Sequence, residues 1–175
     1  MAILGVDDFK AKLAGGGARA NMFQVTINFP GYAAGNVELT SFMCKGAQMP
    51  ASVIAPVEVN FRGRKLQMAG DRTFEPWTVT VINDVDFAVR DGFERWMNGI
   101  AEHQNGVGIA NPIDYQADLI VQQLNKAQEV TKTYEIRGAF PTNVSAIDVN
   151  YDSENTIEEF TVEFNFQYWT SNTTS

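Results

Sequence analysis

The stretch MAGDRTFEPWTVTVIND, residues 68–84, gathers side chains that could do chemistry directly in front of an alternating segment. Asp71 and Arg72 place an acid beside an electrophilic cation, a pairing that the mouth of an active site could use. In a turn between strands, such a pair more often forms an ion pair or caps backbone amides. Nothing nearby offers a nucleophile or a general base with a physical reason for a shifted pKa, so a structural interpretation is favoured.

Other candidate sites each lack a required part. His103 is the only histidine, and its polar surroundings favour a surface loop. The segment GGGARAN lacks the Gly-Lys-Ser/Thr ending of a P-loop. Asp148, Asp152 and Glu154 lack the alternating oxygen ligands and the final Glu of a calcium loop. With Cys44 as the single cysteine, no intrachain disulfide can form. We therefore expect no enzyme activity, no metal and no cofactor.

Composition favours one β-rich domain in a chain of 175 residues with 12 Phe, 5 Tyr and 3 Trp. The 21 acids and 13 bases give a formal net charge of −8. This charge argues against tight binding of nucleic acid, which needs clustered Lys and Arg, but an acidic wall would let nucleic acid pass without sticking. The chain lacks a signal-peptide pattern and a long apolar run, so we expect cytoplasmic synthesis, a soluble product and no membrane anchor.

Alternating apolar and polar residues predict about eight strands, and the absence of strand–helix alternation predicts an antiparallel barrel or sandwich. Turns are expected at 62–64, 70–71, 126–127 and 141–143. The expected strands cover residues 22–29, 37–46, 51–61, 77–82, 117–125, 130–140, 144–152 and 159–168.

One helix is predicted after Asp84, whose carboxylate can cap it. Gly92 within this helix costs about 1 kcal/mol relative to Ala, so tertiary packing must hold the helix in place. Its apolar face consists of Val89, Phe93, Trp96, Met97 and Ile100.

Three regions are expected along the chain. Residues 1–21 contain three consecutive glycines and predict a flexible N-terminal arm that orders on assembly. Residues 22–169 form the β domain, and residues 170–175 form a short polar tail.

The segments NMFQVTINF, GRKLQMAGDRTFEPWTVTVIND, PTNV and FTVEFNFQYW occur in this order over about residues 21–169. Together they resemble the tail tube proteins of contractile-tailed phages of the T-even type. The chain departs from that pattern by its longer Gly-rich start and its polar tail. We also consider an inner-tube subunit of a type VI secretion system or another contractile injection system, and a monomeric ligand-binding β-barrel.

The resemblance implies a β-barrel or sandwich with one packed helix, six copies of which close a ring with a continuous inner β-barrel. Stacked rings would form a virion tail tube, assembled in the host cytoplasm, that holds the tape-measure protein and passes genomic DNA without specific binding. It also implies contacts with the tail sheath, baseplate and tail terminator proteins.

The alternation in 37–45 and 57–61 makes Glu38, Glu58, Thr40 and Asn60 candidates for facing the tube lumen, with Gln122 as a further one. Candidate ring or subunit contacts lie in the Pro-containing loop 46–56 and in the following cluster of charged residues. They are Met49, Pro50, Ser52, Val53, Ile54, Arg62, Arg64, Asp71 and Arg72.

Overall fold

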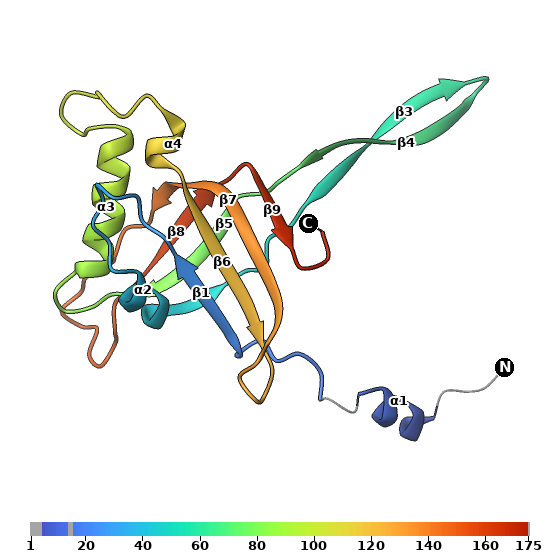
Figure 1. Ribbon diagram of the computed structural model, residues 1–175, viewed down its shortest axis with the longest axis horizontal. Coiled ribbons are helices and arrows are strands. Elements are labelled where there is room, and N and C mark those ends of the chain that lie inside the picture. Colours follow the sequence, from blue (N-terminus) through green and yellow to red (C-terminus); the bar gives the residue numbers. More distant parts are fainter. Residues whose placement is uncertain (1–4, 14–15, 175) are drawn as a thin grey trace.

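The computed structural model describes residues 5–13 and 16–174, and it shows a β body from which two segments project (Figure 1). The strands are β1 Phe23–Ile27, β2 Cys44–Ala47, β3 Val53–Phe61, β4 Arg64–Thr73, β5 Trp77–Ile82, β6 Ala117–Leu124, β7 Val130–Val144, β8 Glu159–Asn165 and β9 Tyr168–Ser171. The helices are α1 Val6–Lys12, α2 Val37–Met43, α3 Ala88–Ile100 and α4 Pro112–Tyr115.

The body is built on an antiparallel sheet in the order β1-β6-β7-β8-β5-β2, with β9 added to β7. The first part of β7 pairs with β6 and β9, whereas its last residues pair with β8, so this strand belongs to two layers. The mainly β, antiparallel class is confirmed. The described sheet is not closed, because β1 and β2 stand at the two ends of the order.

The core lies between the two layers and follows the alternation in the sequence. In β5 every second residue from Trp77 is buried, and in β8 the buried residues are Phe160, Val162 and Phe164. Apolar side chains of the other layer complete this core: Val25, Ile27, Leu119, Val121, Ile136 and Ala139. The predicted inward faces of these strands are therefore confirmed.

Helix α3 covers one end of the core with the predicted face, since Val89, Phe93 and Trp96 are buried. The carboxylate of Asp84 accepts the backbone N–H groups of Ala88 at 3.2 Å and Val89 at 3.4 Å. The predicted cap is thus confirmed, although the helix begins four residues later.

Gly92 has a packing role that explains its place inside a helix. A Cβ added at this position would lie 3.2 Å from the Cα of Gly35 and 3.3 Å from the ring of Phe29. Such distances are tighter than ordinary van der Waals contact, so the small residue lets the helix approach the 29–35 loop closely. Tertiary packing therefore compensates for the low helix propensity of glycine.

The expected strand at 37–46 was wrong for most of its length, because residues 37–43 form helix α2. The side chain of Asn36 accepts the N–H of Leu39 at 3.0 Å, and this N-cap starts the helix. Thr40 is fully buried, and its hydroxyl donates to the carbonyl of Asn36 at 2.7 Å. A segment this short fits a helix or a strand by periodicity, and local capping decided the outcome.

Three expectations near the C-terminus also need correction. The turn expected at 141–143 is part of β7, and residues 145–158 contain no strand. The last strand is interrupted after Asn165, where the N–H of Gln167 donates to the carbonyl of Arg137 at 3.1 Å. The chain then continues as β9 through Ser171, so the sheet extends past residue 169.

A single helix was expected, but the described residues contain four, of which α1 precedes the β body. This helix stands away from the body in Figure 1, and its Val6, Phe9 and Leu13 are exposed. Residues 1–4 and 14–15 of the expected arm lie outside the described residues, and the flexibility of the arm stays a prediction.

We expect Phe93→Ala to lower the free energy of unfolding by about 3–5 kcal/mol, because it removes a fully buried ring from the core. The matched control is Phe42→Ala, since Phe42 is 79% exposed and should change the value by less than about 0.5 kcal/mol. Urea unfolding of unassembled protein measures both. Equal losses for the two variants would contradict this description of the core.

Candidate functional site

The most prominent surface feature is the β3–β4 hairpin, which extends far beyond the body in Figure 1. Its two strands pair antiparallel from Val53↔Thr73 to Phe61↔Arg64, and all their residues except Gly70 are exposed. The turn is Arg62-Gly63, with φ values of 47° and 82°. Two residues with positive φ match the tight turn that suits the twist of paired strands. The predicted turn at 62–64 is confirmed.

The hairpin has one apolar and one polar face. The register places Val57 opposite Met68, and Val59 opposite Leu66, with side chains on the same face. The alternate pairs Glu58↔Gln67 and Asn60↔Lys65 lie on the other face. The exposed apolar residues of both strands are Val53, Ile54, Val57, Val59, Phe61, Leu66 and Met68. The apolar face proper, made by Val57, Val59, Leu66 and Met68, is left open to solvent by the described residues.

Polar side chains tie the two strands together on the other face. Lys65 Nζ donates to Glu58 Oε2 at 2.8 Å, and Gln67 Nε2 donates to Glu58 Oε1 at 2.7 Å. The bond from Lys65, followed by that from Gln67, lowers the pKa of the Glu58 carboxyl from its usual value. The carboxylate therefore stays charged at neutral pH on an exposed face of the hairpin.

Gly70 and Asp71, at the base of the hairpin, do not form the turn that was expected there. Both residues lie inside β4, where the pairing shifts between Ile54 and Pro56 as in a β-bulge. A Cβ on Gly70 would lie 2.5 Å from the carbonyl oxygen of Ala55, so the close approach of the strands requires glycine. Among the described residues, no ion pair joins Asp71 to Arg72.

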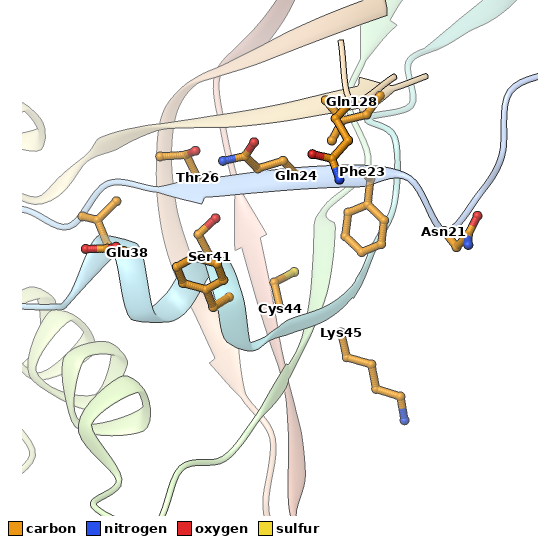
Figure 2. Close-up of a pocket in the computed structure, with 12 residues that line it drawn as sticks. Asn21, Phe23, Gln24, Thr26, Glu38, Ser41, Cys44, Lys45 and Gln128 are labelled. Carbon is orange, nitrogen blue, oxygen red and sulfur yellow. The ribbon is translucent and has the colours of Figure 1, made fainter. Parts of the chain in front are cut away.

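A groove of about 870 Å³ occupies the gap between the two end strands of the sheet, β1 and β2. Figure 2 shows Gln24 and Thr26 from β1 above Ser41 from α2, with Cys44 at the start of β2. Burial raises the pKa of the Cys44 thiol to about 11, so this group is protonated and a poor nucleophile at neutral pH. The groove is bordered by the open edges of β1 and β2.

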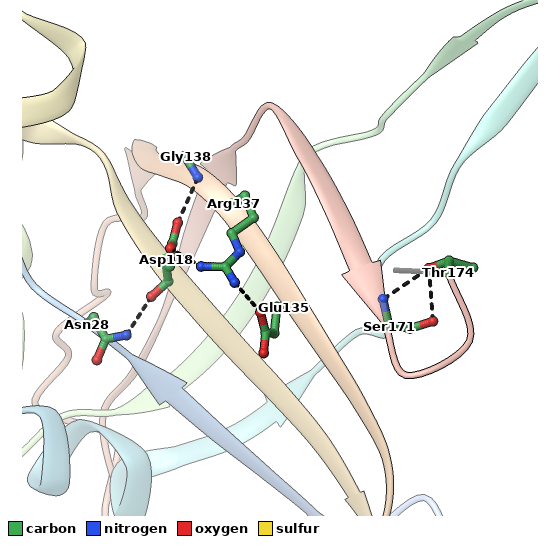
Figure 3. Close-up of polar contacts among 7 residues, drawn as sticks. All are labelled: Asn28, Asp118, Glu135, Arg137, Gly138, Ser171 and Thr174. Atoms are coloured by element: carbon green, nitrogen blue, oxygen red, sulfur yellow. Dashed lines mark hydrogen bonds and ion pairs between the residues drawn. The ribbon is translucent and has the colours of Figure 1, made fainter.

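The outward face of the sheet beside this groove carries polar side chains. Gln122 of β6 lies opposite Gln24 on one side and Thr133 on the other. Next to this row, Arg137 donates to both Asp118 and Glu135, and these charges raise the pKa of its guanidinium (Figure 3). The sequence predicted Gln122 at this face but not the charged group of Arg137, Asp118 and Glu135. Asp118 lies on β6 and the other two on β7, so only the pairing of these strands brings them together.

Figure 3 also shows the contact between Asp118 and Gly138, at the bend of β7. Asp118 Oδ1 accepts the N–H of Gly138 at 3.1 Å, and the carbonyl of Asp118 accepts from Asn28 at 2.8 Å. Gly138 has a φ of 63°, a conformation that favours glycine. The group therefore supports the backbone where β7 passes from one layer to the other.

The structure separates the predicted lumen residues. Glu58 and Asn60 share the polar hairpin face, whereas Glu38 lies on α2 beside the groove. Thr40 is fully buried in its own chain and cannot line a lumen, so this prediction was wrong.

The predicted contact residues fall on the hairpin and on the loop in front of it. Pro50 is buried within the chain, which leaves it no free surface for a neighbour, and this prediction was also wrong. The others are exposed: Met49, Ser52, Val53, Ile54, Arg62, Arg64, Asp71 and Arg72.

Metal-binding side chains and membrane-spanning helices are two further features that bear on function. Within residues 5–13 and 16–174, no group of three His, Cys, Asp or Glu side chains could hold a metal ion, and His103 is exposed beside Asn98. In the same residues, none of the helices has the length and apolar character needed to span a bilayer. The prominent features of this surface are therefore the exposed hairpin and the open strand edges.

A chain with these surfaces belongs to the class of β subunits whose free edges and projecting strands are suited to assembly. A model of the family described as phage tail tube protein matches residues 18–172. The chain is 39% identical over 166 residues to the tail tube protein of Enterobacteria phage T4, covering 94% of this chain and 98% of that protein. The tail tube protein of Serratia phage KSP90 is 29% identical, covering 92% and 93%.

The chain therefore belongs to the phage tail tube protein family and is a structural protein of the virion tail. Its fold resembles a chain in a sheath–tube complex of an extracellular contractile injection system, with a TM-score of 0.64, 14% identity and coverage of 93% and 96%. A chain of the anti-feeding prophage baseplate gives 0.65 at 15% identity, covering 89% and 95%. The expected phage tail tube family is confirmed over the alternatives.

We expect Lys65→Met to raise the pKa of Glu58 toward its usual value, because the variant removes the bond that lowers it most. Because the pKa of Glu58 is lowered in the folded state, its contact with Lys65 contributes its full stabilisation above the unfolded-state pKa. This stabilisation is lost as the pH falls through the folded-state pKa. Carboxyl NMR titration of unassembled protein measures the shift. Arg72→Met is the control, and a Glu58 pKa that is the same with and without Lys65 would contradict the assignment.

Proposed function

We infer that the chain closes hexameric rings, which stack into a tube around a lumen, and that the β3–β4 hairpin makes the principal contact with a neighbouring subunit. The observation that carries this proposal is the uncovered apolar face of the hairpin. Burial of apolar surface contributes about 25 cal/mol per Å², and an isolated two-stranded hairpin is marginally stable in water. A neighbouring copy supplies the surface that the hairpin lacks.

The open edges of β1 and β2 support ring closure. Unpaired strand edges are templates for pairing with another chain, and a closed ring of subunits removes them. In this proposal the sheets of successive subunits join into a continuous inner β-barrel. A chain of similar fold comes from a baseplate described as 6-fold symmetrised, which supports the hexamer.

The polar face of the hairpin and the polar outward face of the β1–β6–β7 layer are the surfaces suited to an aqueous lumen. Glu58, Asn60 and Gln122 are the lumen residues that we propose. The chain carries a net charge of −8, and in this proposal an acidic wall repels DNA and keeps it mobile as it passes into the host. Before contraction, the same lumen holds the tape-measure protein. The chain acts as a passive conduit and performs no catalytic step.

The outer surface of the tube meets the tail sheath through weak charged contacts that let the sheath move over it. Chains of similar fold come from a sheath–tube complex, a sheath/tube terminator and a baseplate, which supports contacts with these three classes of protein. The N-terminal arm, including the exposed apolar side chains of α1, orders on assembly beside the loop 46–56 of a neighbour.

We expect Val59→Asp combined with Leu66→Asp to abolish tube formation, because the two changes put charge on the apolar hairpin face. The folded body should remain, since neither side chain belongs to the core. Negative-stain electron microscopy measures assembly, and circular dichroism checks folding. The control is Asn60→Asp on the opposite face, which should still form tubes. Normal tubes from the first variant would contradict the proposal.

We expect Glu58→Lys with Asn60→Lys to leave tubes intact but to reduce DNA delivery at least about tenfold, because positive charge in the lumen binds phosphates. Phage assembled with the variant are compared by electron microscopy of tails and by plaque counts per particle. Glu102→Lys with Asn105→Lys, at exposed positions beyond the end of α3, makes the same change in net charge and is the control for charge alone. Full infectivity of intact particles that carry the lumen variant would count against this lining.

A further inference from the structure

The tip of the hairpin is a basic knob, here defined as residues 61–65. Phe61 is 66% exposed, and the guanidinium of Arg62 lies over its ring at 5.3 Å from the centroid. Lys65 is paired with Glu58, but Arg62 and Arg64 form no ion pair within the described part of the chain. The tight Arg62-Gly63 turn fixes these side chains on a small projecting surface. The knob therefore presents uncompensated positive charge beside an exposed aromatic ring.

A surface of the opposite sign lies on the segment 146–158, here called the acidic loop. It contains no Lys or Arg, and the side chains of Val149, Tyr151 and Ile157 are exposed. A hollow of about 380 Å³ is formed by this loop, and its lining includes Asp148 and Val149. The acids of the loop are Asp148, Asp152, Glu154 and Glu158. The loop therefore combines negative charge, exposed apolar side chains and a concave surface.

The acidic loop is anchored to the body at both ends. Ser145, just before it, accepts from Arg90 at 3.1 Å through its carbonyl. At the other end, Asn83 donates to the carbonyl of Glu158 at 2.9 Å and also to its carboxylate at 2.9 Å. By contrast, Glu159 on the following strand is already paired with Lys45 in the same chain. Of the acids near this edge, Asp148, Asp152 and Glu154 are the ones left to meet a partner, since Glu158 is already bonded to Asn83.

The knob and the acidic loop lie at opposite ends of the long axis of the molecule (Figure 1). A projection at one end and a complementary hollow at the other suit a head-to-tail contact that every copy can repeat. A two-fold arrangement that brought two knobs together would instead place like charges side by side. The position and sign of the two surfaces thus favour one partner, which is a second copy of this chain.

We propose that the basic knob of one subunit docks on the acidic loop of the next copy. Arg62 and Arg64 face the carboxylates of Asp152 and Glu154, while Phe61 packs against the exposed apolar side chains of the loop. This inference rests on the proposed function, because it names the surface that receives the hairpin. Exposed ion pairs are individually weak, so the charges set register and orientation, and the apolar contacts supply most of the affinity.

Charge reversal and its repair test the contact. Arg62→Glu with Arg64→Glu, and separately Asp152→Lys with Glu154→Lys, should each raise the critical concentration for tube assembly at least about tenfold near 0.15 M salt. A chain with all four changes should return to within about threefold of the wild type, because the charges are complementary again. Light scattering measures the critical concentration, and electron microscopy confirms that the polymers are tubes.

Lys126→Glu with Lys132→Glu is the matched control, since it changes net charge by the same amount as the knob variant at positions outside both surfaces. It should assemble like the wild type. Wild-type tubes combined with no effect of the knob reversal, or with no repair in the four-change chain, would overturn this inference and leave the tube function standing. A wild-type chain that stays monomeric at every concentration would instead overturn the proposed self-assembly and this contact with it.

A crosslink gives a second readout that does not depend on charge. In a Cys44→Ser background, tubes assembled from a mixture of Arg62→Cys and Asp152→Cys chains should form disulfide-linked dimers on mild oxidation. Tubes that combine Arg62→Cys with Lys126→Cys chains should form few such dimers. Equal yields from the two mixtures would overturn the assignment of the acidic loop as the receiving surface.

Discussion

The bend of β7 at Gly138 determines how the two layers of the body meet. Before the bend the strand pairs with β6 and β9, and after it the strand pairs with β8, so one backbone carries both sheets. Asp118 holds the N–H of Gly138 in place, and the positive φ of this residue suits glycine. The buried core forms between the layers as a consequence, with α3 covering one of its ends.

This arrangement closes a core but leaves strand edges unpaired at β1 and β2. An isolated chain thus carries two features that are unfavourable in water, which are open edges and an uncovered apolar hairpin face. In the function that we propose, the arrival of further copies covers both. The incompleteness of the single subunit would then be the physical basis of assembly.

Much of the body could be predicted from local patterns. The alternation around Trp77 and Phe164 gave the buried faces of β5 and β8, and Asp84 gave the carboxylate that caps α3. Prediction failed where a local pattern fitted both a helix and a strand, or where a contact with a distant residue decided the local structure. Helix α2 replaced a strand because Asn36 caps it, and the last strand broke where Gln167 bonds to Arg137. The role of Gly70 also required the opposite strand, because only the pairing shows how close Ala55 comes.

The sequence by itself determined the family, the β class and the acidic composition of the chain, because these depend on residue types, local periodicity and motif order. It also placed Glu58 and Asn60 correctly on one face of an extended segment, since side chains alternate along a strand. Only the tertiary structure decided that the hairpin projects uncovered, that Thr40 is buried, and that the knob and the acidic loop lie at opposite ends. These properties depend on how the elements pack against one another in three dimensions, which no local pattern specifies.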